Sequence, residues 1–124
     1  MASLPKLSRE TDRMVPAPVL YILLSLADEE RHGYAIMQDV RDRTGGRIVL
    51  GPGALYTSLQ RALQAGYIRE VTRRAAQEVD RRGRRAYRLT AEGRRAAQRE
   101  LARLETVMRM ARHARLKPLT DVEP

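Results

Sequence analysis

The chain has 124 residues and a net charge of +9, and 43% of its residues are apolar, so it suffices for one domain with a real core. The absence of cysteine excludes disulfide scaffolds, thiolate metal sites and iron–sulfur clusters, and the two histidines, His32 and His113, lie far apart in sequence. No apolar run approaches the length of a membrane span, and the N-terminus does not resemble a signal peptide. We therefore expect a cytoplasmic protein without a metal or a cofactor.

The positive charge is concentrated in one part of the chain. Residues 67–100 carry a net charge of +6, which is two thirds of the total, and 22 of the 24 basic residues are arginine. A GC-rich genome would also enrich arginine, but it would not gather the charge in about a quarter of the chain. Such a concentration is typical of a protein that binds a polyanion.

The first half of the chain predicts three helices. Residues 1–15 are polar and form either a tail or a short helix. Pro16 and Pro18 then mark the start of a helix predicted over 17–28, which is apolar on nearly every side. An amphipathic helix is predicted over 33–44, where two glycines end it. After a β-like run at 47–50, a third helix is predicted over 52–65.

The second half predicts a β-hairpin and one long helix. Strands over 67–72 and 85–89 flank an arginine-rich turn. Thr90 is a candidate N-cap for a helix over 91–115, and residues 116–124 are expected to be a flexible tail. Apolar residues recur along this helix at steps of three and four, as in a coiled-coil seam. We expect this seam to be a dimer interface formed by Leu101, Leu104, Val107, Met108 and Ala111.

Together these elements predict a mainly α fold with a small β-hairpin, namely a winged helix-turn-helix over 16–90 followed by a dimerisation helix. In that fold the third helix enters the major groove of DNA and the hairpin reaches the backbone or the minor groove. On the outward face of this helix, Gly53 and Thr57 leave room for the groove floor, while Gln60 and Arg61 can reach bases or phosphates. A helix face that is merely exposed to solvent would have a similar composition. The basic hairpin that follows is the feature that favours nucleic-acid binding over this alternative.

Three blocks of sequence, in this order, resemble the PadR family of transcriptional regulators. They are HGY at 32–34, GPGALYTSLQRALQAGYI at 51–68 and GRRAYRLTAEG at 83–93. The resemblance covers about residues 16–95, and the single C-terminal helix is similar to that of the small subfamily, in which it builds the dimer. It implies a homodimer that binds a pseudo-palindromic operator in double-stranded DNA, usually as a repressor. It also allows release by a small apolar or aromatic effector held between the subunits.

The resemblance also implies roles for individual residues. It makes Tyr56, Thr57 and Arg61 DNA contacts, with Tyr56 on a phosphate. Tyr34 is either a weaker DNA contact or a packed core residue, and we favour the core. Tyr87 is expected to pack the wing on the body. The wing residues expected to contact phosphates or the minor groove are Arg81, Arg82, Arg84 and Arg85.

The chain departs from the family pattern in three respects, and one of them is that the wing residues 73–82 match nothing in that pattern. Ala62 and Leu63 stand where the family usually has Leu and then Glu, so a contact made by that Glu is lost. The chain also has no Trp, whereas some members stack a planar ligand on a Trp of the last helix. That part of the family's ligand recognition cannot be transferred to this chain.

Other classes of function fit the sequence less well. We find no nucleophile–base pair, phosphate loop or paired acids, so we do not expect an enzyme. A winged helix that serves only protein interaction would not need so basic a hairpin. The main alternative is a winged helix that binds RNA or single strands by stacking bases on tyrosine. Most of the five tyrosines, however, fall on apolar faces.

Overall fold

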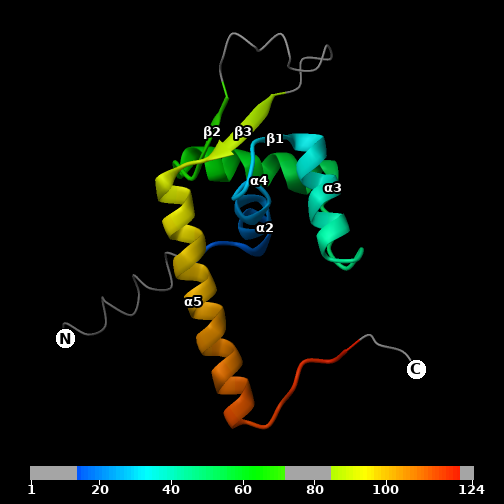
Figure 1. Cartoon of the computed structure of the whole chain (residues 1–124), viewed down its shortest axis with the longest axis vertical. Coiled ribbons are helices and arrows are strands. Elements are labelled where there is room, and N and C mark those ends of the chain that lie inside the picture. Colours follow the sequence, from blue (N-terminus) through cyan, green and yellow to red (C-terminus); the bar gives the residue numbers. More distant parts are fainter. Residues whose placement is uncertain (1–13, 72–84, 121–124) are drawn as a thin grey trace, which may run out of the picture.

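The computed structural model describes residues 14–71 and 85–120 (Figure 1). Three helices and a small sheet form the body of the molecule. The N-terminal half of a long last helix packs against this body, and its C-terminal half extends away from it (Figure 1). In chain order the elements are α2 (Ala17–Ser25), β1 (Arg31–His32), α3 (Gly33–Arg43), α4 (Pro52–Gln64), β2 (Ile68–Glu70), β3 (Ala86–Leu89) and α5 (Ala91–His113). This arrangement confirms the predicted winged helix-turn-helix with a long C-terminal helix.

The core lies between α2, α3 and α4 and is closed by the start of α5. Its largest fully buried side chains are Ile22, Leu23, Ile36, Leu55 and Leu59, and those of α3 and α4 come from the apolar faces predicted from helical spacing. Small residues of α5, Ala96 and Ala97, are also buried, which lets this helix approach closely. Burial of these apolar faces is the main stabilising contribution to the fold.

The sheet has three strands where the sequence predicted two. The additional strand, β1, pairs antiparallel with β3, and the strand order is β1-β3-β2. Two residues are too few to show the alternating pattern that identifies a strand in a sequence. The pairing arises because the chain passes the open edge of β3 on its way from α2 to α3.

The β-like run at 47–50 is a loop in the structure, so that prediction is wrong. Its three consecutive apolar residues alternate in burial: Ile48 is half-buried and Leu50 is buried against the body, while Val49 is exposed. Thr44 stabilises the loop, because its hydroxyl donates to the carbonyl of Val40 at 2.8 Å and accepts from the backbone N–H of Ile48 at 3.1 Å. The apolar pattern thus reflects packing and not strand pairing.

Two of the predicted helices end earlier than expected. The helix predicted over 17–28 stops at Ser25, and the one predicted over 91–115 stops at His113. The start of α5 agrees with the prediction, because the Thr90 hydroxyl accepts from the backbone N–H of Gly93 at 3.0 Å. At the end of α4, Gly66 has a φ of 79°, and the next N–H, that of Tyr67, donates to the carbonyl of Ala62 at 2.9 Å.

A network around Asp39 fixes α3 against the end of α2 and against the sheet. The Asp39 carboxylate accepts from the Ser25 hydroxyl at 2.8 Å and from Nε of Arg43 at 3.0 Å. Arg31 of β1 donates from Nε to the carbonyl of Ser25 at 2.8 Å. Because Asp39 and Arg31 are largely shielded from water, these bonds hold α3 against α2, and α4 packs on the same helix.

A second buried carboxylate connects α5 to the segment before α2. Glu100 is only 5% exposed, and it accepts from the backbone N–H of Val15 at 3.4 Å and from Nε of Arg103 at 3.0 Å. The hydrogen bond from Arg103 holds the pKa of Glu100 below its ordinary value. The carboxylate therefore stays ionised at neutral pH and anchors the chain where it enters α2.

Candidate nucleic-acid interface

Helix α4 separates an apolar face from a polar one. Its buried residues are Leu55, Ser58, Leu59 and Ala62, and Pro52 occupies its first turn, where a missing N–H costs nothing. On the opposite face all the residues predicted to contact DNA are exposed: Gly53, Tyr56, Thr57, Gln60 and Arg61. The side chains of Thr57, Gln60 and Arg61 make no hydrogen bond or ion pair with residues 14–71 or 85–120. This face is therefore free to bind a ligand.

The N-terminal end of α4 is open to a close approach. No side chain forms a capping hydrogen bond there, and the intrahelical ladder leaves the first N–H groups of a helix without partners. A Cβ added at Gly51 or at Gly53 would meet no atom within 4 Å. The fold itself therefore does not require glycine at these positions, whereas a backbone that approaches a phosphate or a groove floor would benefit from it.

Tyr34 lies on the surface, so the expectation that it packs in the core is wrong. Its side chain is 49% exposed, and its hydroxyl accepts from Nε2 of Gln38 at 3.4 Å. Helical spacing placed it near the apolar stripe of α3, but in this turn the buried positions are taken by Gly33 and Ile36. Tyr56 is 57% exposed, and its hydroxyl would lie 3.7 Å from a Cβ at Gly33. Both tyrosines therefore lie where the start of α3 meets α4.

The wing, of which the structure describes β2 and β3, projects from the body next to α4 (Figure 1). Tyr87 of β3 is buried, as predicted for a residue that packs the wing on the body, and this burial raises the pKa of its hydroxyl. Arg85 is exposed and pairs with Glu70 of β2, with 2.9 Å between Nη1 and Oε2. The other three predicted wing contacts, Arg81, Arg82 and Arg84, lie outside the described residues.

The sheet also places Arg69 directly opposite Arg88. Neither stands out in the sequence, where arginine is abundant, because their proximity depends on the register of the two strands. The sequence would have revealed the pair only if the register of the two strands had been predicted correctly.

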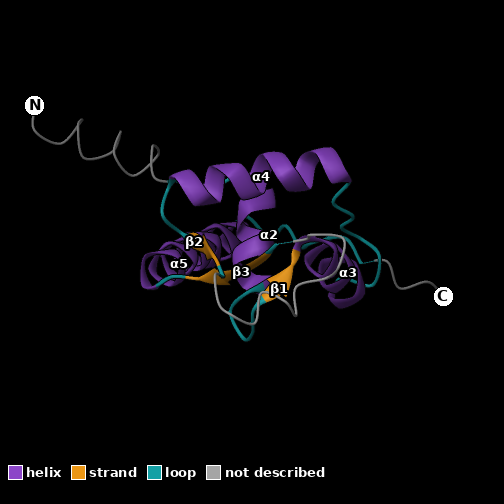
Figure 2. Cartoon of the chain, turned by 90° about the horizontal axis from the view of Figure 1, so that it is seen from above, coloured by secondary structure: helices purple, strands orange, loops and turns teal. Residues whose placement is uncertain are grey.

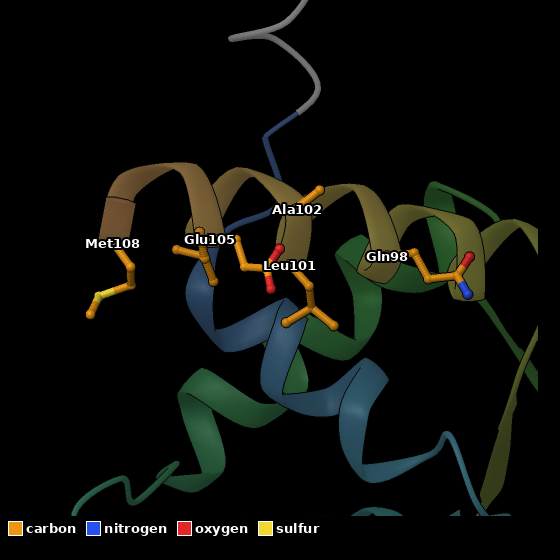
Figure 3. Close-up of a pocket in the computed structure, with 6 residues that line it drawn as sticks. Gln98, Leu101, Ala102, Glu105 and Met108 are labelled. Atoms are coloured by element: carbon orange, nitrogen blue, oxygen red, sulfur yellow. The ribbon is translucent and has the colours of Figure 1, made fainter. Parts of the chain in front are cut away.

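The apolar seam predicted on α5 is exposed over much of its length. Leu101, Val107 and Met108 are exposed, whereas Leu104 and Ala111 are half-buried, and Leu104 also packs against the core. Leu101 and Met108 border a shallow groove along the helix together with Gln98, Ala102, Leu104 and Glu105 (Figure 3). The seam thus begins inside the body and continues where α5 extends beyond it.

Two other features are absent from the described residues, a metal-ligand cluster and a membrane-spanning helix. Within residues 14–71 and 85–120, no three His, Asp or Glu side chains lie close enough together to hold a metal ion. In the same part of the chain, no helix has the length and apolar character needed to cross a membrane.

Comparison with solved structures identifies similar folds. A transcriptional regulator from Clostridium thermocellum superposes with a TM-score of 0.67 at 23% identity, over 77% of this chain and 87% of that one. A PadR family transcription regulator from Clostridium difficile gives 0.65 at 21% identity, over 79% and 97%. A PadR-like transcription factor from Bacteroides fragilis gives 0.64 at 18% identity, over 90% and 98%. These similarities concern the fold.

Comparison of the sequence with protein families gives a more specific result. None of the curated proteins matches the chain. The sequence model of the PadR-like family of transcriptional regulators, however, matches residues 22–99. This match extends from the middle of α2 into the first half of α5, and it includes the whole helix-turn-helix and the described part of the wing. The chain therefore belongs to the PadR-like family of transcriptional regulators.

Proposed function

We propose that the protein is a repressor that binds a specific operator in double-stranded DNA as a homodimer, in the cytoplasm. The observation that carries the proposal is the outward face of α4, where Thr57, Gln60 and Arg61 are exposed and unpartnered among the described residues. Side chains of this kind read base edges in the major groove. Membership of the family supports DNA binding as such.

The exposed seam of α5 supports the homodimer. Leu101, Val107 and Met108 expose apolar surface on a helix that extends beyond its own body. Such a contiguous apolar surface is typical of an interaction site. A second copy packed on this seam by two-fold symmetry would present two α4 helices to one face of the DNA, about 34 Å apart. The operator would then be pseudo-palindromic.

The same seam supports the proposed effector. The groove along α5 between Leu101 and Met108 is mostly apolar, and a thioether adapts its shape readily to different ligands. In a dimer this groove would be partly enclosed by the partner. We propose that a small apolar or aromatic molecule binds there and releases the protein from DNA.

Helix α4 and the wing are expected to contribute differently to binding. Thr57→Ala should lower the ratio of operator to random-DNA affinity by about tenfold, because it removes a side chain that reaches bases. Arg85→Ala should weaken binding to both duplexes about equally, because a phosphate contact carries no sequence information. It should also reduce the slope of log affinity against log salt by about two units for a dimer. Titrations on a duplex selected by the wild-type protein and on a scrambled duplex measure both effects.

Arg109→Ala is the matched control, because Arg109 is an exposed arginine on α5 away from the DNA-facing elements. It should leave the slope and the ratio unchanged. If Arg85→Ala collapses the ratio while Thr57→Ala preserves it, the two roles are assigned the wrong way round.

The exposure of Tyr34 and Tyr56 favours one other function, the binding of RNA or single strands by stacking. The same titrations include the separate strands of the selected duplex and the matching RNA, at equal salt. We expect the duplex to bind more tightly than any of these. Tighter binding to a single strand, lost on Tyr56→Ala, would contradict the proposed function.

A further inference from the structure

Two arginines face each other across the wing. Arg69 in β2 is the register partner of Arg88 in β3, and both side chains are exposed. The flanking ladder bonds run from the N–H of Val71 to the carbonyl of Ala86 and from the N–H of Thr90 to the carbonyl of Tyr67. Ladder bonds alternate along antiparallel strands, so the arginines form a hydrogen-bonded pair with Cα atoms about 5.5 Å apart. Their side chains therefore leave the sheet side by side.

Neither arginine of this pair forms an ion pair among the described residues. Neither guanidinium lies within 4.0 Å of a carboxylate in that part of the chain, although Arg85, on the same hairpin, pairs with Glu70. Extending the β1–β3 register by one residue brings Glu30 next to Arg88, yet these two do not form an ion pair. Like charges directly opposite each other destabilise a sheet. The free protein therefore carries a repulsion that an external anion would relieve.

The pair lies on the face of the sheet that points away from the core. Side chains alternate between the faces of a strand, and the neighbours Ile68 and Tyr87 are buried on the opposite face. Ile68 and Tyr87 belong to the same buried core as Leu55 and Leu59 of α4, so that opposite face is the one turned toward α4. Figure 2 shows α4 on one side of the sheet. The arginine pair therefore points to the far side of the wing.

We propose that Arg69 and Arg88 together bind a backbone phosphate of duplex DNA on the far side of the wing, outside the sequence that α4 reads. The proposal rests on the proposed function, because it assumes that α4 and the wing engage DNA. Two adjacent guanidinium groups offer several N–H donors to the oxygens of one phosphate. Such a contact adds affinity without adding sequence information. It requires DNA that continues past the operator.

The test compares the wild-type protein with Arg69→Gln and Arg69→Glu on two duplexes. One holds only the site selected by the wild-type protein, and the other extends it by about one helical turn, or 10 base pairs, on each side. The wild-type protein should bind the longer duplex more tightly. Arg69→Glu should lose this gain, about tenfold or more, and its salt slope should fall by about two units for a dimer. Arg69→Gln should show the same loss to a smaller extent.

Stability distinguishes this role from damage to the fold. The carboxylate that Arg69→Glu introduces would lie opposite Arg88 and attract it, so the melting temperature of this variant without DNA should rise by about 1–4 °C. Arg109→Gln removes the same charge from an exposed site on α5 and should change neither the duplex preference nor the slope.

The outcomes separate the two proposals. If Arg69→Glu binds the longer duplex as the wild-type protein does, the pair is not a DNA site, and an acidic protein segment or solvent faces it instead. A fall in melting temperature for both variants would contradict the repulsion from which the site is inferred. If the wild-type protein binds neither duplex, the proposed function fails as well.

Discussion

Val107→Asp is expected to convert the proposed dimer into a folded monomer. Val107 is 44% exposed and lies on the part of α5 that extends beyond the body, so its replacement leaves the core of the monomer intact. In a dimer the new carboxylate would be buried without a partner, which costs about 3–5 kcal/mol for each copy. The dimer dissociation constant should therefore rise at least about a thousandfold. Light scattering measures the mass, and a thermal melt confirms that the variant folds.

Val107 is a better choice than Leu104, because Leu104 also packs against the core of its own subunit. Thr106→Asp is the matched control, because it adds the same charge one residue earlier on another face of the helix. Its mass should equal that of the wild-type protein. An unchanged mass for Val107→Asp would show that the seam does not hold two copies together.

Gly93→Ala is expected to destabilise the protein strongly, although alanine is the better helix former by about 1 kcal/mol. Gly93 lies in the first turn of α5, directly over the chain that leaves α4. A Cβ there would overlap the carbonyl oxygen of Tyr67 and lie 2.8 Å from both the carbonyl carbon of Tyr67 and Cδ1 of Leu89. Backbone atoms cannot move aside as a flexible side chain can, so α5 would have to shift.

That shift would also break contacts of the N-cap residue. The Thr90 hydroxyl donates to the carbonyl of Gly66 at 2.7 Å, and the backbone N–H of Thr90 donates to the carbonyl of Tyr67 at 3.0 Å. We expect a loss of about 3 kcal/mol or more in the free energy of unfolding. A thermal melt should show a decrease of more than about 10 °C.

Gly53→Ala is the control for this substitution. Its Cβ would meet no atom within 4 Å, so its stability should equal or slightly exceed that of the wild-type protein. Its DNA affinity should nevertheless fall, because Gly53 lies where α4 is proposed to approach the groove. Equal melting temperatures for Gly93→Ala and the wild-type protein would contradict the close packing of α5 on the α4–β2 junction.

The elements that could be predicted from the sequence are those with local causes. Helical periodicity identified the buried faces of α3 and α4. Single residues identified the C-terminal end of α4 and the N-terminal end of α5. Gly66 stops α4 because it adopts a positive φ, and Thr90 starts α5 because its hydroxyl accepts an N–H. These features depend on residues a few positions apart, so one sequence suffices to find them.

The features that could not be predicted depend on distant contacts. Strand β1 exists because it meets β3, which lies more than fifty residues later in the chain. Periodicity places Tyr34 on one side of α3 but does not show where the core ends, so its exposure was missed. The opposition of Arg69 and Arg88 depends on strand register, which a turn of unknown geometry does not fix.

Footprinting of the wild-type protein on its selected duplex with hydroxyl radicals tests the central claim most directly. Two α4 helices related by two-fold symmetry should protect two backbone patches on the same face of the DNA, with their centres about 34 Å apart. Protection should extend outward from each patch, where the wings lie. A single protected patch, or two patches on opposite faces of the duplex, would contradict a homodimer that reads DNA through α4.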